Sequence, residues 1–455
     1  MYWLLNMKVS FNQYIPLSFL LVSFIGYILT PRTQEFSYTI YYMTIAVAIS
    51  SLIFYYKCRN KNNFLDFDTL FITICYLIGY FATFFYNQPY YKAFFIFEFN
   101  YSYLNSGAWL FTIGMNAYFC GSLFVKSNRK VSNKKVKIYP TQILYIINIG
   151  LMFAFIMCGG IGFYQRVYAD AGGEGGGITV YVQLLLSIIS IMLIVIEIRN
   201  KFIKKDYKIH YAYFITIILF ALLLLYLGNR TTASMLILPM IGLLTHWFKP
   251  IKFRFFIIFL ILGIFSMWIV QQLRTGEQVR VNISYPALML MDMTIPSRTI
   301  YESMEIVDSE GLNYGKTMFS PIIGVVPGLA GIILGKSGYG SAELFTKYAY
   351  EKFNVPVENQ IGLGSTIISD IYLSFGVVGV ILFMWLLGRT IHIVELNSKY
   401  GDLFSSFLLG VFLANSVFWA RTSYAYPARL IVWGSLLMMI YLSIIFTYCK
   451  YKNHE

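Results

Sequence analysis

The chain has 455 residues, of which 58% are apolar and only 12% are charged, and its mean hydropathy is +0.64. A soluble domain carries roughly 25% charged residues, so this composition excludes an ordinary soluble protein. Apolar runs of about 18 residues recur along the chain, and each is a candidate membrane helix. We therefore predict an all-α polytopic membrane protein rather than two or three soluble domains.

The apolar runs divide the sequence into twelve predicted spans and one long hydrophilic interval. The predicted spans are 12–30, 38–56, 69–86, 107–125, 141–159, 178–196, 211–228, 231–248, 255–272, 365–387, 403–420 and 430–448. The hydrophilic interval runs from Arg274 to Gly362, between the ninth and tenth spans. The prediction is a single integral membrane domain of residues 1–455 with one large outer loop at 274–362.

The net charge of +14 is distributed unevenly between the two sides of the predicted membrane domain. One side holds 22 of the 35 Lys and Arg residues and 7 of the 21 acidic residues, and the other holds 13 and 14. Because membrane proteins retain positive charge on the cytoplasmic side, both termini are expected in the cytoplasm and the large loop in the periplasm. The basic excess thus indicates topology and predicts no nucleic-acid partner.

The kind of basic residue also differs between the sides. The cytoplasmic set contains 17 Lys and 5 Arg, whereas the outer set contains 5 Lys and 8 Arg. Topology needs positive charge of either kind, but planar, bidentate recognition of phosphate needs Arg. The outer arginines are therefore the candidate ligands for an anion.

Arg230 is the first of these arginines to stand at a helix start. The turn Leu227-Gly-Asn-Arg-Thr-Thr joins the seventh and eighth spans at the outer boundary. This places Arg230 beside backbone N–H groups and the positive end of a helix dipole, which is unfavourable unless an anion binds there. The alternative is an interfacial anchor.

The remaining outer arginines stand near other span ends. Arg421 and Arg429 flank the short turn between the last two spans, and they could converge with Arg230 on one polyanion. Arg166 lies in the third outer connection. For each of these, snorkelling to lipid headgroups is the alternative.

The large loop contains three further predicted elements. Pro286–Ile295 can form a short helix that includes Asp292, and Met318–Leu334 is apolar but broken by prolines and glycines. The broken stretch is too interrupted to span the membrane and is expected to be re-entrant or to lie at the interface. Ser341–Phe353 has the pattern of an amphipathic surface helix, and Arg298 is far from any span end.

Asp370 is predicted about five residues inside the tenth span. An ionisable group in a membrane helix is a functional candidate, with a structural hydrogen bond inside the bundle as the alternative. The first outer connection, Pro31 to Phe36, holds only Glu35 as an acidic residue, and the cysteines show no metal-ligand spacing. No metal or other cofactor is therefore expected.

In its layout and in several short motifs the chain resembles the Wzy-type oligosaccharide repeat-unit polymerases of O-antigen and capsule synthesis. The layout is similar in the many spans and in the large outer loop late in the chain. The motifs are the Gly-Asn-Arg-Thr turn at Arg230, the run Gly-Leu-Gly-Ser-Thr at 362–366 followed by Asp370 and Phe375-Gly-Val-Val-Gly, and the Arg421/Arg429 pair. The resemblance implies a fold of the GT-C-like membrane glycosyltransferase class, which O-antigen ligases share.

The resemblance also implies a function. A protein of this family would be a metal-independent glycosyltransferase in the bacterial inner membrane. It would join undecaprenyl-diphosphate-linked oligosaccharide units at the periplasmic face, transferring the growing chain to the non-reducing end of a new unit of lipopolysaccharide or capsule. Besides membrane lipid, a chain-length regulator and a flippase would be partners. An O-antigen ligase-like glycosyltransferase and a lipid-linked oligosaccharide flippase or transporter are the alternatives.

The chemistry that the resemblance implies assigns roles to these residues. Charge develops on a diphosphate leaving group, and preorganised arginines stabilise it. The predicted diphosphate ligands are Arg230, Arg298 and Arg421, with Arg166, Arg274, Arg280 and Arg429 as a second tier. Related ligases use an outer-face histidine, whereas every His here maps to the cytoplasmic side. A base, if one is used, should then be Asp370, Asp292 or Glu302, in an order that the sequence leaves open.

Overall fold

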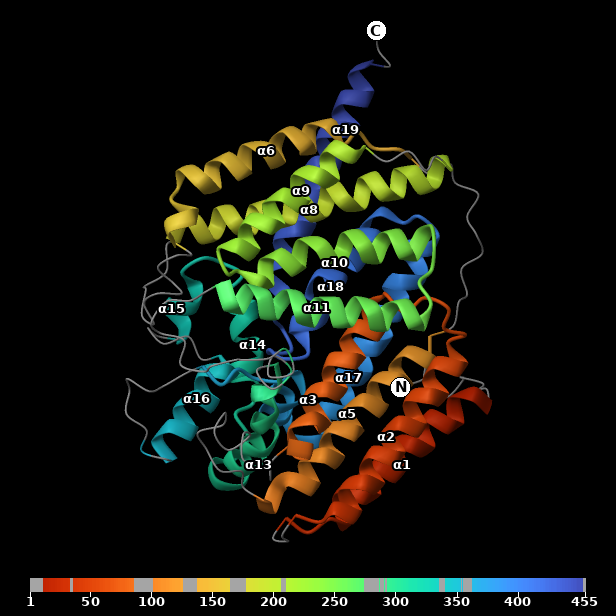
Figure 1. The fold of residues 1–455 in the computed structure, drawn as a ribbon, viewed down its shortest axis with the longest axis vertical. Coiled ribbons are helices and arrows are strands. Elements are labelled where there is room, and N and C mark those ends of the chain that lie inside the picture. The colour runs from red at the N-terminus through yellow and green to blue at the C-terminus, as the bar shows by residue number, and fades with distance from the viewer. Residues whose placement is uncertain are drawn as a thin grey trace.

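The computed structural model describes residues 11–32, 36–85, 101–125, 137–163, 177–205, 210–273, 293–334, 340–352 and 362–452, together with 286, 290 and 354. Every regular element within these ranges is helical (Figure 1). The long helices are α1 (Phe11–Leu29), α2 (Tyr38–Cys58), α3 (Phe67–Phe85), α5 (Leu104–Leu123), α6 (Gln142–Met157), α8 (Gly177–Lys204), α9 (Tyr211–Tyr226), α10 (Arg230–Trp247), α11 (Phe253–Leu273), α17 (Ile367–Lys399), α18 (Leu403–Trp419) and α19 (Ala428–Lys452). Each coincides with one of the predicted spans, so the all-α prediction is confirmed.

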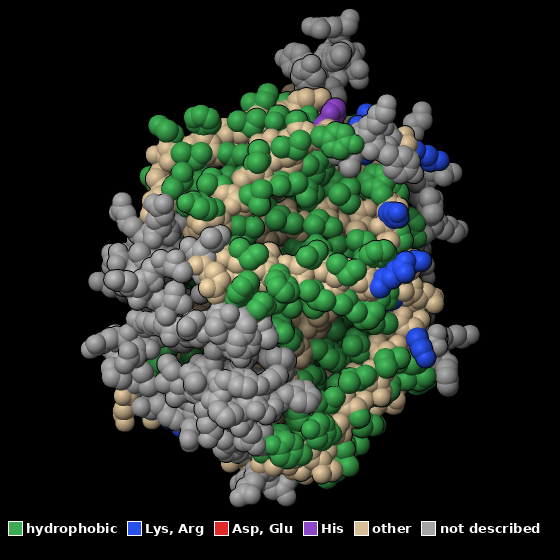
Figure 2. All heavy atoms as spheres, viewed as in Figure 1, with side chains coloured by type: hydrophobic (Ala, Val, Ile, Leu, Met, Phe, Trp, Pro, Cys, Tyr) green, Lys and Arg blue, Asp and Glu red, His purple; other side chains and the backbone are tan. Residues whose placement is uncertain are grey.

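The described helices have the apolar length that a multi-pass membrane protein needs. By length and composition, five of them, α2, α8, α11, α17 and α19, could each cross a membrane, and shorter apolar helices accompany them. Helix α11 exposes Phe255, Ile258 and Leu262 on its outer face. Figure 2 shows hydrophobic side chains over most of the described surface on this side of the molecule. The number of spans, twelve, stays a prediction.

The helices end in two groups. In one group, Arg199 of α8 donates through Nε to the carbonyl of Gly401, 2.7 Å away, just before α18 begins. Trp247 of α10 donates through Nε1 to the carbonyl of Ser398 near the end of α17, at 3.3 Å. We name this group the basic end, because Lys and Arg gather along the corresponding edge of the molecule, on the right in Figure 2. The opposite end, which carries the helices of the large loop, is the loop end.

Helices α5 and α17 form the centre of the bundle. A methyl group added at Gly121 of α5 would lie 1.9 Å from the carbonyl oxygen of Trp385, and one added at Gly388 of α17 would lie 2.1 Å from that of Tyr118. No side chain fits at either contact, so the two backbones approach as closely as small residues allow. The core therefore surrounds the helix whose first turn carries Asp370.

Helix α17 is broken once. Gly376 has φ 63° and ψ −161°, which an L-residue with a side chain rarely adopts. The break leaves the carbonyl of Leu373 available, and it accepts the N–H of Asn313 at 3.0 Å. The predicted end of this span at residue 387 is wrong, because the helix continues to Lys399. Asp370 lies in its first turn rather than deep inside it.

The large loop adds η2 (Ile295–Arg298), α13 (Thr299–Glu310), α14 (Lys316–Ile323), α15 (Leu329–Leu334) and α16 (Ser341–Lys352). The predicted surface helix at Ser341 is confirmed. The stretch predicted to be too interrupted to span is split into α14 and α15, with a turn at Gly328 (φ 79°). Half of the helix predicted at 286–295, including Asp292, lies outside the described residues.

Candidate functional site

The start of α17 is held by hydroxyl groups. Thr366 caps the helix by accepting the N–H of Ser369 at 3.1 Å, and the Ser369 hydroxyl accepts the N–H of Thr366 at 3.0 Å. The Thr299 hydroxyl lies 2.9 Å from that of Ser369, and Ser341 donates to Ser365 at 2.9 Å. This reciprocal capping satisfies N–H groups that a helix start otherwise leaves unpaired. The starts of α13, α16 and α17 are thereby joined at one place.

Asp370 connects this cluster to the last outer turn. Its side chain is fully buried, and its Oδ2 accepts the backbone N–H of Tyr424, 2.9 Å away, in the turn between α18 and α19. The side chains of Thr317 and Ser341 also approach the carboxyl group. A hydrogen bond that a backbone N–H donates to a charged acceptor is among the stronger kinds. Asp370 therefore fixes where the turn that contains Arg421 lies.

The turn after α18 has anchors on both sides. Trp419 donates through Nε1 to the carbonyl of Tyr424 at 2.8 Å, within the turn. Arg421 is half-buried at its start. Arg429 is exposed and donates through Nη2 to the carbonyl of Gly324 at 2.9 Å, where α14 ends. A cation at a helix C-terminus is favourable, so Arg429 ties α19 to the large loop.

Arg230 starts α10 at the same end of the bundle. The side chain of Asn229 caps this helix by accepting the N–H of Thr232 at 3.1 Å, and Arg230 is half-buried. Helices α10 and α18 pack side by side, with a methyl group at Gly242 meeting Leu413 at 2.7 Å. They run in opposite directions along the chain, so the start of α10 and the end of α18 share the loop end. The structure brings Arg230 and the Arg421 turn to this end on neighbouring helices.

Arg298 and Glu302 form a buried ion pair. Arg298 donates to Oε1 of Glu302 through Nε at 2.9 Å and approaches it through Nη2 at 2.8 Å. Burial raises the pKa of Glu302, although the neighbouring guanidinium opposes this. Its Oε2 has no hydrogen-bond partner among the described residues. Arg298 is not a solvated loop charge, because only 5% of its surface is exposed.

Four predicted site residues, Arg166, Arg274, Arg280 and Asp292, lie outside the described residues. The other six, Arg230, Arg298, Glu302, Asp370, Arg421 and Arg429, all belong to elements of the loop end. Within the described part of the chain, no group of three or more His, Cys, Asp or Glu side chains is placed to hold a metal ion. Metal independence stays a prediction.

Sequence reasoning missed a second ion pair at the loop end. Arg32, just after α1, bonds Asp308 of α13 through Nη1, and its Nη2 donates to Tyr27 at 2.9 Å and to Tyr372 at 3.3 Å. Burial disfavours the charged guanidinium, but the bond to Asp308 raises the pKa of Arg32 above its usual value. Arg32 belonged to the arginine-rich outer set, which was the available signal. Its partner is 276 residues away and has no local signature.

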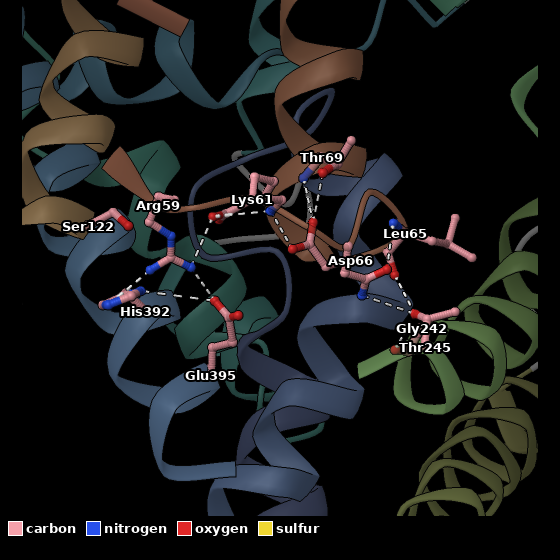
Figure 3. Close-up of polar contacts among 12 residues, drawn as sticks. Arg59, Lys61, Leu65, Asp66, Thr69, Ser122, Gly242, Thr245, His392 and Glu395 are labelled. Atoms are coloured by element: carbon pink, nitrogen blue, oxygen red, sulfur yellow. Dashed lines mark hydrogen bonds and ion pairs between the residues drawn. The ribbon is translucent and has the colours of Figure 1, made fainter. Parts of the chain in front are cut away.

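A network of charged side chains at the basic end was also missed (Figure 3). Arg59 at the end of α2 bonds Glu395 of α17 and lies 3.5 Å from Asp68 of α3. Lys61 bonds Asp66 in the same connection. The charge distribution explained these cations as topology signals, so their acidic partners were not considered.

A helical bundle with five described helices long and apolar enough to cross a membrane defines a class, the multi-pass integral membrane protein. The family model described as "O-antigen polysaccharide polymerase Wzy" matches residues 2–453, nearly the whole chain. The chain belongs to this family, which polymerises lipid-linked oligosaccharide repeat units in the membrane. Neither the curated proteins nor the solved structures contain a significant match.

Proposed function

We propose that the loop end faces the periplasm from the bacterial inner membrane and joins undecaprenyl-diphosphate-linked repeat units there. The growing chain is transferred to the non-reducing end of a new unit. One observation carries this proposal beyond family membership: Asp370 bonds Tyr424 N at 2.9 Å, so the Arg421 turn is held against the start of α17. Arg230 stands at the same end on the neighbouring helix α10.

The proposed reaction needs no metal. The acceptor hydroxyl attacks the anomeric carbon, the bond from that carbon to the diphosphate oxygen breaks, and the carrier diphosphate leaves with the electron pair. Arg230 and Arg421 stabilise the charge that develops on it, and Arg298 assists. In this scheme the hydroxyl proton goes to Glu302, because burial raises the pKa of its carboxyl group and makes its carboxylate a stronger base. Asp370 acts as a positioning residue.

Two wider proposals follow from the family relationship. The helical bundle is similar in plan to GT-C-like membrane glycosyltransferases, with its site between a large loop and the helix ends. A flippase supplies the new unit, and a chain-length regulator contacts the polymerase. The flippase delivers a substrate to the loop end, and the regulator acts on the product there.

Conservative arginine variants test the site. Arg230→Lys and Arg421→Lys keep the charge but lose the bidentate fork. In a strain lacking the endogenous protein, each variant should reduce polymer formation by about 10²–10³-fold, the usual cost of losing one such donor. The measurement is the ladder of surface polysaccharide on a gel, normalised to protein level.

Arg254→Lys is the matched control. Arg254 is an exposed arginine at the start of α11, at the basic end. It should leave the ladder unchanged. A normal ladder from both loop-end variants would remove Arg230 and Arg421 from the site. Deletion should leave surface lipid capped with single repeat units; complete loss of capped lipid would favour a ligase or a flippase.

Two native cysteines test which end faces outward. Cys158 is exposed at the end of α6 at the loop end, and Cys58 is the last residue of α2 at the basic end. In single-cysteine variants, a membrane-impermeant maleimide applied to spheroplasts should label Cys158 and spare Cys58 until the membrane is opened. The reverse pattern would place the loop end in the cytoplasm and contradict the proposal.

A further inference from the structure

The basic end contains a cavity of about 520 Å³, far from the arginine-bearing turns. It opens between the ends of α2, α5, α10 and α17 and the connection that precedes α3. Its volume falls in the range of about 300–1,000 Å³ that is typical of small-molecule sites. Figure 3 shows Arg59, Lys61, Asp66, His392 and Glu395 from this wall. The proposed polymerase reaction uses none of these residues.

The carboxylates that line this cavity already have donors. Glu395 bonds Arg59 through Oε2 and Lys399 through Oε1, the latter at 3.1 Å. Asp66 accepts the N–H of Thr69 through Oδ1 at 3.0 Å and bonds Lys61 through Oδ2. Each carboxylate oxygen thus has a hydrogen-bond donor or a cation beside it. The lining carboxylates offer little to a bound cation.

The side chains that line the cavity have more hydrogen-bond donors than the neighbouring groups accept. Arg59 Nη1 lies 2.9 Å from His392 Nε2, and a guanidinium can only donate, so Nε2 accepts. Neutral His392 therefore carries its proton on Nδ1, which lies 4.0 Å from Oε2 of Glu395 and has no hydrogen-bond partner among the described residues. The buried Nε2 of His246 likewise has none there. Lys399 has further N–H groups on an ammonium that is half exposed.

The lining residues alone carry a small positive formal charge. Arg59, Lys61 and Lys399 supply three positive charges, against two negative charges from Asp66 and Glu395. The side chains of Arg59 and Lys61 are only 8% and 6% exposed, so water screens them weakly. Asp68, behind this wall, lies 3.5 Å from Arg59 and 3.9 Å from Lys61 and offsets the third positive charge. The wall therefore suits an anion through its hydrogen-bond donors rather than through a net charge.

We propose that the basic-end cavity binds a phosphate-bearing anion. Phosphate oxygens accept charge-assisted hydrogen bonds from Lys, Arg and imidazole N–H groups. Basic pockets between membrane helices on the cytoplasmic side suit the headgroups of anionic phospholipids, and a soluble phosphate compound would present the same chemistry. This site is separate from the loop end, so its failure leaves the polymerase proposal untouched.

Cys58 lines the cavity and reports its occupancy. We would place the full-length protein in nanodiscs of phosphatidylcholine, with or without added phosphatidylglycerol, and measure alkylation of Cys58 by an uncharged maleimide. Bound phosphatidylglycerol should slow this reaction several-fold. Exposed Cys158, at the opposite end, should react at the same rate in both lipids. Glycerol phosphate added to pure phosphatidylcholine nanodiscs tests the soluble source.

Two variants test the lining itself. Lys399→Gln removes an exposed cation, and His392→Gln removes the Nδ1 donor while keeping an acceptor for Arg59. Both should lose the protection of Cys58. Lys347→Gln is the matched control, because Lys347 is also an exposed lysine with an (i, i+4) glutamate partner, but at the loop end. It should keep the protection. An unchanged unfolding temperature verifies that each variant is folded.

Each outcome has one meaning. Protection by phosphatidylglycerol alone identifies a lipid site, and protection by glycerol phosphate alone identifies a site for a soluble phosphate compound; both support a phosphate-binding cavity. Equal Cys58 reactivity under all conditions overturns the proposal. So does protection that persists unchanged in both Lys399→Gln and His392→Gln. The polysaccharide ladder does not enter this test.

Discussion

Two groups of charged residues, one at each end of the bundle, are held by different kinds of contact. At the basic end, Arg59 and Lys61 are buried against carboxylates, and side chain pairs with side chain. At the loop end, the Arg421 turn is held through the backbone N–H of Tyr424, and Arg429 bonds the backbone of Gly324. The bond to Tyr424 N–H fixes the position of this turn through Asp370 and the backbone, so the anchor does not involve the Arg421 side chain.

The largest effect is expected where a buried ion pair is broken at the basic end. Arg59→Met removes the buried cation that Glu395 and Asp68 share and leaves them only Lys399 and Lys61, respectively. Breaking a buried ion pair costs up to about 3–5 kcal/mol, and the remaining lysines set this as the upper bound. The unfolding temperature in detergent should fall accordingly. Adding Glu395→Gln should restore part of the loss. If Arg59→Met unfolds at the normal temperature, the network is not a stabilising feature of this end.

Two substitutions of Asp370 distinguish a positioning role from a catalytic role. Asp370→Ala leaves the N–H of Tyr424 without an acceptor, which costs about 1–3 kcal/mol and frees the Arg421 turn. Asp370→Asn keeps a carbonyl acceptor. We expect short polymer from the Ala variant and a nearly normal ladder from the Asn variant, at matched protein levels. Loss of the ladder in both variants would instead make the carboxylate the base.

Glu302 should make the stability of the loop end depend on pH. Because burial raises its pKa in the folded protein, the folded state binds a proton more readily than the unfolded state. The resulting stabilisation is complete below the ordinary glutamate pKa of about 4.3 and is lost as the pH rises through the raised value. Unfolding temperatures measured across this window should show the loss in the parent protein. Glu302→Gln should flatten it, and an unchanged profile would assign the dependence elsewhere.

The smallest effect is expected at the Arg32–Asp308 pair. Both side chains are about one-third exposed, and such pairs contribute about 0–1 kcal/mol. Asp308→Asn should therefore hardly change the unfolding temperature. If the pair positions α13 for catalysis, the ladder should shorten while stability holds. A ladder that is unchanged in both Asp308→Asn and Arg32→Lys would limit the pair to a surface role.

The sequence was sufficient to predict the helices and to predict that most candidate residues lie at one end of the bundle. Apolar runs long enough to span a bilayer have few alternatives, and the alternation of turns between two sides then places Arg230 and Arg421 together. Interaction partners that are distant in sequence could not be predicted. No local sequence pattern pairs Arg32 with Asp308. Likewise, no pattern around Asp370 indicates that its carboxylate oxygen accepts the backbone N–H of Tyr424.

The errors have physical causes. The apolar run of α17 continues past residue 387, with His392 and Glu395 on a face that is buried in the basic-end network, so hydropathy alone ended the span too early. Positive charges near span ends are explained by topology whether or not they are paired. Because topology already accounted for these charges, the cavity that Arg59 and Lys61 line was not predicted.

The break at Gly376 also bears on how deep each part of α17 lies in the membrane. Helix α17 has 33 residues, about 50 Å at 1.5 Å per residue, whereas the hydrocarbon core of a bilayer is about 30 Å thick. The stretch after the break, residues 377–399, is about 35 Å long and is sufficient to cross it. We therefore expect the short segment before the break, with Asp370, to lie among the lipid headgroups. In the proposed reaction a lipid carrier would hold its diphosphate at that level, so the donor and the start of α17 would meet without drawing either charge into the hydrocarbon.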